Sequence, residues 1–462
     1  MLDDYEDTLA RALARLESRT SFAELMAERS SGYMFSHERQ TTEAAPRTPS
    51  QGVVLRAWNG DRWVESATVG LDSASVDRVV DDLSRQLPGH RAGSNPPGKS
   101  TTGHNSRSVE ARKPVRDITV EERESVTKLW YGWATQVPGI LNAQTHVQDL
   151  SNERLYLSTA GAFRYQLVTR VACAVAPVAI ENGRVEYDFA YAGGVGGFEI
   201  VDRITEESVK DVANEAHRLL SAKLPPTGPT TVLMDPSTAG TFAHESFGHG
   251  TEADQMLRDR SYLKPLIGQV VAPEILTIAD DGSLPGGWGS IFFDDEGHPT
   301  ERTALIDHGR FAEVLHDRET AAALGGKPKG NARRANFLSR PFVRMTNTFV
   351  DPGSSTYDEL VREARDGILL EHATSGIEDP LGGQMQIKVK KARRIEHGEL
   401  TELYSSAALS GRVLDVLRAV RGVSGPTDFQ MSPGTCGKGH SDQLPAGTGG
   451  TYLLSEAVVG PA

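Results

Sequence analysis

The chain has 462 residues, which is long for one domain and predicts two or three. Its formal net charge of −13 excludes a nucleic-acid-binding surface as the default, because such affinity comes mainly from Lys and Arg. Two cysteines, Cys173 and Cys436, cannot cross-link so long a chain, so we expect reduced thiols inside a cell. No apolar run nears the ~20 residues that cross a bilayer, and the acidic start does not resemble a secretory signal, so a cytoplasmic location is expected.

The first part of the chain predicts helices mixed with antiparallel strands. An amphipathic helix is expected over residues 5–17 and a second helix over 76–87. Between them, strands are predicted at 53–58 and 62–69, on either side of Asn59-Gly60-Asp61, which is a hairpin signal.

Residues 88–117 are rich in Gly, Pro, Ser and basic residues, which predicts a linker or a long mobile loop. A helix over 120–133 follows, because Thr119 and Glu122 form a capping-box pattern. The sequence then turns to strands, predicted at 154–160, 164–180 and 184–191, with a second hairpin turn at Asn182-Gly183.

The main domain boundary is expected after the helix that Thr205 begins, which covers 206–222 and ends at Leu224-Pro225-Pro226. Residues 1–225 would form an N-terminal α+β domain, and residues 226–462 a C-terminal domain.

The C-terminal domain is predicted to contain many short strands separated by Gly, Asp and Pro turns. Helices interrupt them only near 236–247, 356–369 and 409–418. Strands and helices do not alternate regularly, so a parallel doubly wound sheet is disfavoured. The predicted fold class is α+β, with a mixed helix and antiparallel-sheet N-terminal domain and a strand-rich, antiparallel C-terminal domain.

The strongest local signal is His244-Glu245-Ser246-Phe247-Gly248-His249. The usual zinc helix motif has histidines at i and i+4, about 40° apart around the helix. Here the spacing is i and i+5, which would place them about 140° apart on a regular helix. One ion can bind both only if the helix widens into a π-type turn, or ends before His249 at Gly248. A solvent-exposed helix end with two histidines is the alternative.

A metal site would need a third ligand, and Cys436 is the candidate. Glycines lie close to it on both sides, so the backbone can fold tightly around an ion. Two imidazoles and a thiolate form an accepted catalytic zinc set, and the softness of sulfur favours zinc over magnesium or calcium. A reactive or idle loop thiol is the alternative. Cys173 lies in an apolar predicted strand and is interpreted as a small buried hydrophobic side chain.

Longer stretches of the sequence resemble one family. AHESFGHGTEADQ at 243–255 resembles the TldD/PmbA signature, in which a His-Glu-x-x-x-His run is followed by Gly and an acidic residue. The similarity covers residues 226–456 and continues, in the same order and spacing, through 267–310, 330–337, 343–350 and the Cys-Gly-Lys at Cys436. The N-terminal half fits the family only as a helix, hairpin and helix pattern.

The resemblance implies an intracellular metallopeptidase that acts on unstructured peptides, including leader segments of modified peptides. It also implies a dimer, either of two copies or of a TldD-like catalytic chain with a PmbA (TldE)-like paralogue that lacks the metal motif. This sequence resembles the catalytic chain: His244, His249 and Cys436 would hold one zinc ion, and Glu245 would be the general base acting on a metal-activated water. No nucleic-acid or membrane partner is expected.

Three further residues are weaker candidates for substrate contacts. The segment after Cys436 is one residue longer than is usual in the family. Within it, His440 is interpreted as a surface residue or a substrate contact, with a supporting contact to a metal ligand as the less favoured alternative. Arg333 and Arg344 could bind a substrate carboxylate bidentately, with structural ion pairs as the equal alternative.

Other charged stretches are predicted to be structural. Asp280-Asp281-Gly282 and Asp294-Asp295-Glu296-Gly297 are expected as acidic turns rather than calcium sites. The basic run at 388–394 predicts a solvated strand edge that resists aggregation.

Two other functions compete with the zinc peptidase. One is a cysteine hydrolase that uses Cys436 with a histidine such as His440, which would survive removal of metal. The other is a non-catalytic regulatory or binding subunit of a TldD/PmbA-type complex, against which the intact His244-Glu245 pair argues.

Overall fold

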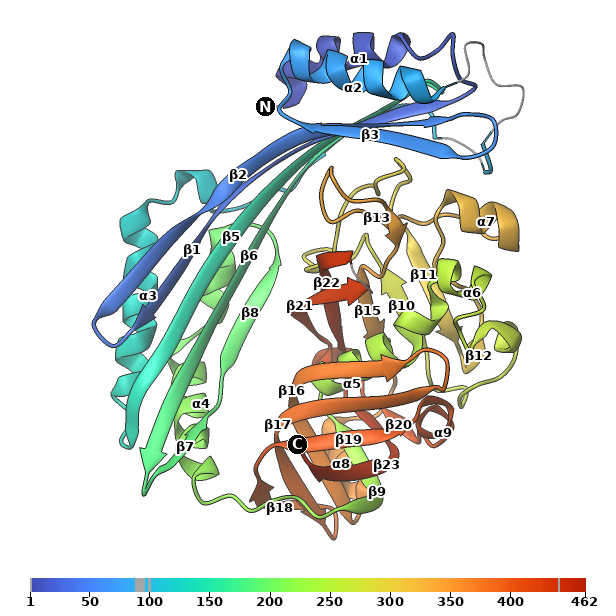
Figure 1. Cartoon of the computed structure of the whole chain (residues 1–462). Coiled ribbons are helices and arrows are strands. Elements are labelled where there is room, and N and C mark those ends of the chain that lie inside the picture. Colours follow the sequence, from blue (N-terminus) through green and yellow to red (C-terminus); the bar gives the residue numbers. More distant parts are fainter. Residues whose placement is uncertain (1, 88–95, 99–100, 439–440) are drawn as a thin grey trace.

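The computed structural model describes residues 2–87, 96–98, 101–438 and 441–462. An N-terminal half is built on one long curved sheet, and a C-terminal half contains two smaller sheets (Figure 1). Most strand pairs are antiparallel, so the predicted α+β class with largely antiparallel sheets is confirmed. No helix among the described residues is long and apolar enough to span a membrane.

The long sheet has the strand order β3-β2-β1-β5-β6-β4, and β7 and β8 also pair with β6. Its strands are β1 (Ala23–Glu38), β2 (Thr41–Trp58), β3 (Trp63–Val69), β4 (Gly103–Ser108), β5 (Ile140–Ser158), β6 (Ala162–Glu181), β7 (Arg184–Tyr187) and β8 (Ala190–Val195). The hairpins predicted at Asn59-Gly60-Asp61 and Asn182-Gly183 join β2 to β3 and β6 to β7. Of the predicted linker 88–117, residues 88–95 and 99–100 lie outside the described part, and β4 pairs in parallel with β6.

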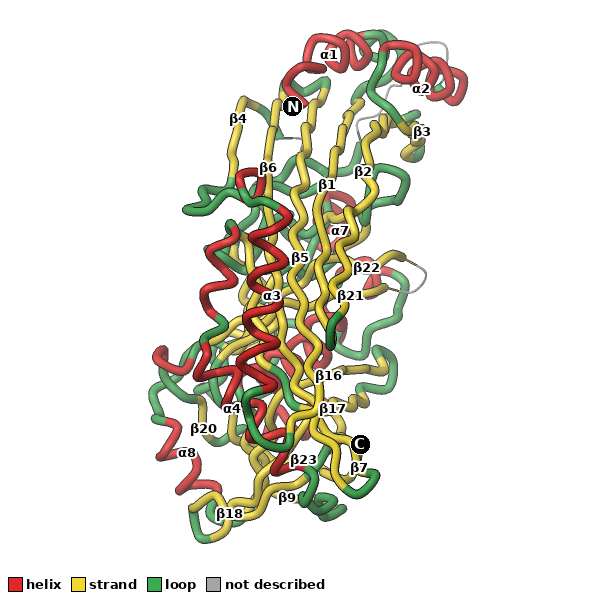
Figure 2. Tube along the Cα trace, turned by 90° about the vertical axis from the view of Figure 1, so that its left-hand side faces the viewer, coloured by secondary structure: helices red, strands yellow, loops and turns green. Residues whose placement is uncertain are grey.

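Four helices accompany this sheet: α1 (Glu6–Ala14), α2 (Ser73–Gln86), α3 (Val120–Thr135) and α4 (Glu206–Leu219). Helices α1 and α2 lie together at one end of the long strands. Helices α3 and α4 pack on one face of the sheet, and the C-terminal half lies on the opposite side (Figure 2). The predicted capping box of Thr119 and Glu122 is present at the start of α3.

The C-terminal half has a six-stranded sheet of order β12-β11-β10-β15-β22-β21 and a seven-stranded sheet of order β16-β9-β23-β19-β17-β18, with β20 paired to β23. Strands β13 and β14 form a small separate ladder. The strands are β9 (Gly228–Met234), β10 (Ile278–Asp281), β11 (Arg302–Asp307), β12 (Arg310–Phe311), β13 (Ala332–Arg333), β14 (Phe342–Val343), β15 (Asn347–Val350), β16 (Gly367–Asp379), β17 (Gln384–Glu396), β18 (Glu399–Tyr404), β19 (Ala407–Arg412), β20 (Gly422–Val423), β21 (Gln430–Lys438), β22 (Ser441–Gly450) and β23 (Leu453–Pro461).

Helix α5 (Pro236–Ala243) is the central element of this half. Nearly all of its side chains are buried, and Phe242 belongs to a core that also draws on both sheets. Gly240 permits close approach to β22, because a Cβ there would lie 2.0 Å from the Gly449 backbone nitrogen. The remaining helices are α6 (Ala253–Leu257), α7 (Arg318–Leu324), α8 (Tyr357–Ala364) and α9 (Val413–Arg418).

The chain reaches the middle of the seven-stranded sheet only with its last strand. Strand β23 lies between β9 and β19, and Leu453 pairs with Met234 of β9. The sheet is therefore completed by residues more than 200 positions apart in the sequence.

The basic run at 388–394 does not form a strand edge, so that prediction is wrong. It lies on β17, which pairs with β16 on one side and with β18 and β19 on the other. Lys390 and Lys391 are buried, and they form ion pairs with Glu186 and Asp188 of the N-terminal half. Opposite charges from the other half of the molecule therefore allow these lysines to be interior.

Buried ion pairs also join the two halves at the turn 294–297. The turn is present as predicted, but its carboxylates are buried rather than solvated. Arg154 of β5 donates two hydrogen bonds to Asp295, at 2.7 and 2.9 Å, and also pairs with Glu28 of β1. Because Asp295 pairs with Arg154 and Glu296 pairs with Arg56 of β2, this turn fixes the C-terminal half against the curved sheet.

Candidate metal centre

Helix α5 ends in the widened turn that brings the two histidines together. Asp235 caps its start by accepting a hydrogen bond of 2.7 Å from the Thr238 backbone nitrogen. At its end, residues 244–248 form a π-type turn, in which the His249 backbone nitrogen donates to the His244 carbonyl. Of the two alternatives that the sequence left open, the structure has the π-type turn, and Gly248 has helical backbone angles instead of ending the helix.

Gly248 is needed for a packing reason that the sequence did not show. A Cβ at this position would lie 2.0 Å from the sulfur of Met345, which packs against the turn. Real Cβ atoms do not approach so closely, so glycine allows the turn to fit into the core.

Cys436 comes to this turn from β21, 187 residues after His249. Its sulfur lies 3.4 Å from Nε2 of His249. The rings of His244 and His249 meet edge to face, with centroids 5.0 Å apart. One ligand atom from each of the three residues lies within 4.8 Å of the other two.

A set of charged residues supports the second nitrogen of His249. Nδ1 lies 3.5 Å from the buried Glu252 carboxylate, which in turn lies 3.0 Å from the Lys438 amine. Lys438 also pairs with Asp254 at 2.7 Å. A carboxylate on the far nitrogen fixes the ring orientation and tautomer of a histidine ligand.

The electrostatics of the centre favour a thiolate. Burial alone would raise the pKa of Cys436, but the adjacent His244 and His249 imidazoles lower it to about 4. Burial would likewise raise the pKa of Glu252, and Lys438 and His249 lower it to about 2. The deprotonated sulfur and carboxylate are the forms that bind and orient a metal.

Glu245 lies on the same turn and lines a cavity of about 500 Å³. Gly376 of β16 faces it: a Cβ at 376 would lie 2.5 Å from Cγ and 2.7 Å from Oε1 of Glu245. The carboxylate therefore occupies space that exists only because residue 376 has no side chain.

Glu378, two residues further along β16, is a second carboxyl group in this region. Burial raises its pKa to about 8, and the Glu245 carboxylate adds to that shift. Its Oε2 atom is buried and has no hydrogen-bond partner among the described residues.

Comparison with known proteins identifies the family. The sequence model of one protein family, the PmbA/TldA metallopeptidase C-terminal domain, matches residues 227–458. The family model of the PmbA/TldA metallopeptidase central domain matches residues 113–224. A metalloprotease of Methanothermobacter thermautotrophicus is 32% identical over 462 residues, which is 98% of each chain. The chain belongs to the PmbA/TldD metallopeptidase family. It is a metalloprotease by homology, as the resemblance predicted.

Two other PmbA/TldD proteins bear on the metal and on the fold. The zinc metalloprotease TldD homologue of Saccharolobus solfataricus is 30% identical over 235 residues, covering 51% of this chain and 52% of its own. The crystal structure of TldE from Thermococcus kodakarensis has a TM-score of 0.73 at 17% identity, covering 98% of this chain and all of its own. The Saccharolobus solfataricus protein is therefore similar to about half of this chain, and TldE shares its fold.

The structure places two of the three weaker candidates of this PmbA/TldD chain, Arg333 and Arg344, away from the cavity. Arg333 is buried and donates to the carbonyls of Met345 and Pro445, the latter at 2.8 Å. Arg344 is buried and donates to the Cys436 carbonyl. Both guanidinium groups therefore bind backbone around the cysteine strand. His440 lies outside the described residues.

Other residues of the centre were not found from the sequence. Glu252 follows His249 by three positions, and residues three positions apart lie on the same side of a helix. This spacing was therefore a detectable signal. Lys438 belongs to the Cys-Gly-Lys that carried the resemblance, but nothing local indicated its partner. Gly376 had no signal, because its role depends on β16 passing the π turn. Cys173 is 3% exposed, as predicted for a buried hydrophobic side chain.

Proposed function

We propose that the chain is a zinc-dependent peptidase that hydrolyses peptide or amide bonds in short or unstructured peptides, with one zinc ion per chain. The observation that carries the proposal is the convergence of His244, His249 and Cys436, with ligand atoms within 4.8 Å of one another, beside Glu245. The zinc metalloprotease among the similar proteins supports the choice of metal.

The distance between two of the donor atoms fits a zinc ion. Nitrogen and sulfur ligands at about 2.0–2.3 Å from one tetrahedral zinc lie roughly 3.3–3.6 Å from each other. The 3.4 Å between Cys436 and His249 matches that range. Three protein ligands leave a fourth position for water or substrate, as in catalytic zinc sites.

The residues of the chain have separable roles in this proposal. Zinc, when bound, supplies Lewis-acid chemistry that lowers the pKa of water and polarises a carbonyl. Glu245 accepts the proton of the attacking water and donates it to the leaving nitrogen. Glu252 orients His249 through Nδ1, so that Nε2 faces Cys436. The confined cavity admits an extended chain but excludes a folded protein.

We also propose that the active form is a dimer, either of two copies or of this chain with a PmbA/TldE-like paralogue. The shared fold with TldE supports this, because similar folds can offer similar interfaces. No nucleic-acid or membrane partner is part of the proposal.

Two substitutions test the function. Cys436→Ala should lose about one zinc per chain, whereas the matched control Cys173→Ala should keep it, both measured by elemental analysis of the purified protein. Glu245→Gln should keep zinc and lose cleavage of an unstructured peptide by about 10²–10⁴-fold. Full cleavage by Glu245→Gln would remove the proposed base. Activity that survives complete removal of zinc would instead favour a cysteine hydrolase.

A further inference from the structure

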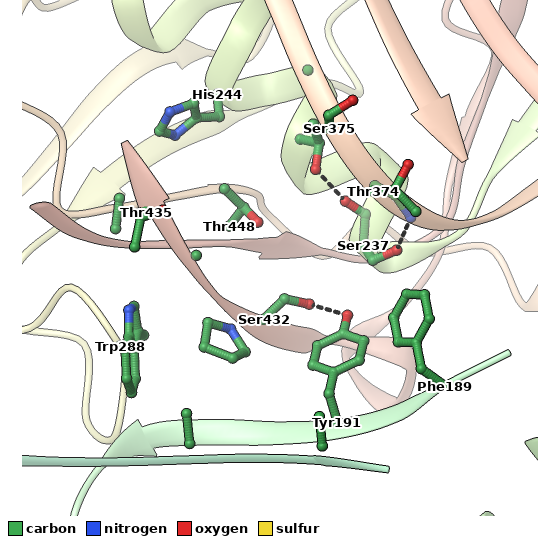
Figure 3. Close-up of a pocket in the computed structure, with 18 of the residues that line it drawn as sticks. Phe189, Tyr191, Ser237, His244, Trp288, Thr374, Ser375, Ser432, Thr435 and Thr448 are labelled. Atoms are coloured by element: carbon green, nitrogen blue, oxygen red, sulfur yellow. Dashed lines mark hydrogen bonds between the residues drawn. The ribbon is translucent and has the colours of Figure 1, made fainter. Parts of the chain in front are cut away.

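The cavity beside Glu245 lies between the two halves of the molecule, and one of its sides is aromatic while the opposite side carries hydroxyl groups. Figure 3 shows Trp288, Tyr191 and Phe189 along one side, next to β8, and Thr374 and Ser375 of β16 on the opposite side. We call it the Glu245 cavity.

The aromatic side of the cavity is held in a fixed geometry. The ring centroids of Phe189 and Tyr191 lie 5.6 Å apart, and the Tyr191 hydroxyl oxygen is 2.6 Å from the Ser432 hydroxyl oxygen. The small residues Ala172 and Cys173 of β6 also line the cavity and leave space beside the rings. A preformed apolar surface with free volume is suited to an apolar group from a ligand.

The cavity lacks a partner for most charged groups. Among the described residues that line it there is no Lys, Arg or Asp, and Glu245 is the one carboxylate. Burial, with Arg47 nearby, lowers the pKa of His146, so this lining residue is neutral at pH 7. An acidic side chain placed here would lose its hydration without an opposite charge in the lining, and a lysine could pair only with Glu245, the proposed base.

One polar atom on the aromatic side is unused. Nε1 of Trp288 is buried and has no hydrogen-bond partner among the described residues, and the side chain is only 8% exposed. A buried donor is normally paired. An oxygen of a bound peptide is a suitable acceptor for it.

From these observations we infer that the Glu245 cavity is a subsite that binds an uncharged, preferentially large apolar side chain next to the cleaved bond, with Trp288 donating a hydrogen bond to the same peptide. The inference rests on the proposed peptidase function, since it names the substrate class of that site. Phe189, Tyr191 and Trp288 would set the preference for the apolar side chain.

The test uses quenched fluorescent octapeptides of Gly, Ser and Ala that carry one variable residue, Phe, Leu, Ala, Lys or Asp, with cleaved bonds located by mass spectrometry. For the zinc-loaded wild-type protein, kcat/KM for cleavage beside Phe or Leu should exceed that for Lys or Asp at least tenfold. Equal values for all five peptides would overturn the subsite while leaving the peptidase function intact.

Variants assign the preference to the aromatic side. Phe189→Ala and Trp288→Ala should each reduce the Phe-to-Ala ratio of kcat/KM at least fivefold, with zinc content and melting temperature followed in parallel. Tyr187→Ala, an exposed tyrosine two residues from Phe189, is the matched control and should leave the ratio unchanged. A ratio that stays the same in both cavity variants would refute the assignment.

Binding separates the subsite from the chemistry. Anisotropy of the same peptides, dye-labelled, on Glu245→Gln should show the Phe and Leu preference without cleavage. If wild-type protein cleaves nothing but this preference appears, the subsite stands and the peptidase proposal fails. If neither cleavage nor preference is seen, both are wrong.

Discussion

Replacing Gly376 by alanine is the sharpest test of how the site is built. The three atoms nearest to a Cβ at this position all belong to Glu245, at 2.5, 2.7 and 2.9 Å. The new methyl group would therefore press on the proposed base and not on His244, His249 or Cys436. The backbone at 376 is not in the left-handed region, so alanine introduces no strain of its own.

The expected magnitude follows from these distances. Carbon atoms in contact lie about 3.5–4.0 Å apart, so the carboxylate must retreat by about 1 Å. A displacement of about 1 Å in a catalytic group can reduce the rate by about 10²-fold. We expect kcat to fall by about that factor, with zinc content unchanged.

The assay is steady-state cleavage of a quenched unstructured peptide, with zinc and melting temperature measured on the same preparations. Gly132→Ala on α3 is the matched control, because nothing lies within 4 Å of its added Cβ. Gly376 also lines the Glu245 cavity, so the substitution could act on substrate instead of on Glu245. The double variant with Glu245→Gln distinguishes these, because two changes that act through one group are not additive.

Two outcomes would refute this reasoning. Full activity of Gly376→Ala would mean that the position of the Glu245 carboxylate does not limit hydrolysis. A double variant that is slower than Glu245→Gln by a further 10²-fold would mean that the methyl group acts on the substrate.

Three other perturbations have expected outcomes. Burial lowers the pKa of His316 from 6.5 to about 4, so the unfolded chain gains a proton at a higher pH than the folded chain. The free energy of unfolding should therefore fall by roughly 3 kcal/mol as the pH drops from 6.5 to 4. Urea titrations at pH 7 and 4.5 should show a smaller fall for His316→Gln than for wild-type protein, and an equal fall would contradict this. Arg154→Met leaves the buried carboxylates of Glu28 and Asp295 without their partner and should lower the free energy of unfolding by about 3–5 kcal/mol. The control Arg15→Met, at an exposed ion pair, should lower it by about 1 kcal/mol or less. Similar losses in both variants would refute the role of Arg154 in joining the two halves. Chelation should lower the melting temperature of wild-type protein but not that of Cys436→Ala, because a bound metal ion stabilises only the folded state that binds it. Equal shifts in the two proteins would exclude Cys436 as a metal ligand.

Local signals in the sequence predicted the local structure well. The hairpin at Asn59-Gly60-Asp61 and the capping box at Thr119 depend on residues a few positions apart, and both are present. Strand β5 was predicted only at 154–160 and extends from Ile140 to Ser158. Its first part alternates buried and exposed positions and is polar, so only its end contains an apolar run.

Interactions between distant segments account for what the sequence did not predict. The basic run looked like a strand edge because the carboxylates that neutralise Lys390 and Lys391 come from residues 186 and 188 of the other half. The histidine spacing was enough to predict an irregular helix end, with a π-type turn as one of two alternatives, since that is a property of one helix. The approach of Gly376 to Glu245 depends on how β16 crosses α5, which no local pattern contains.

The position of β23 has a consequence for how this protein is made. Strand β9 emerges from the ribosome 219 residues before Leu453, the first residue of its central neighbour, which at 5–20 residues per second is a delay of roughly 10–40 s. Throughout that interval the edge of β9 that pairs with β23 has no neighbour, and an unpaired edge can associate with other chains. Cys436 also follows β9 by about 200 residues, so acquisition of the metal and closure of the sheet belong to the same stage of biosynthesis, after β9 has been made.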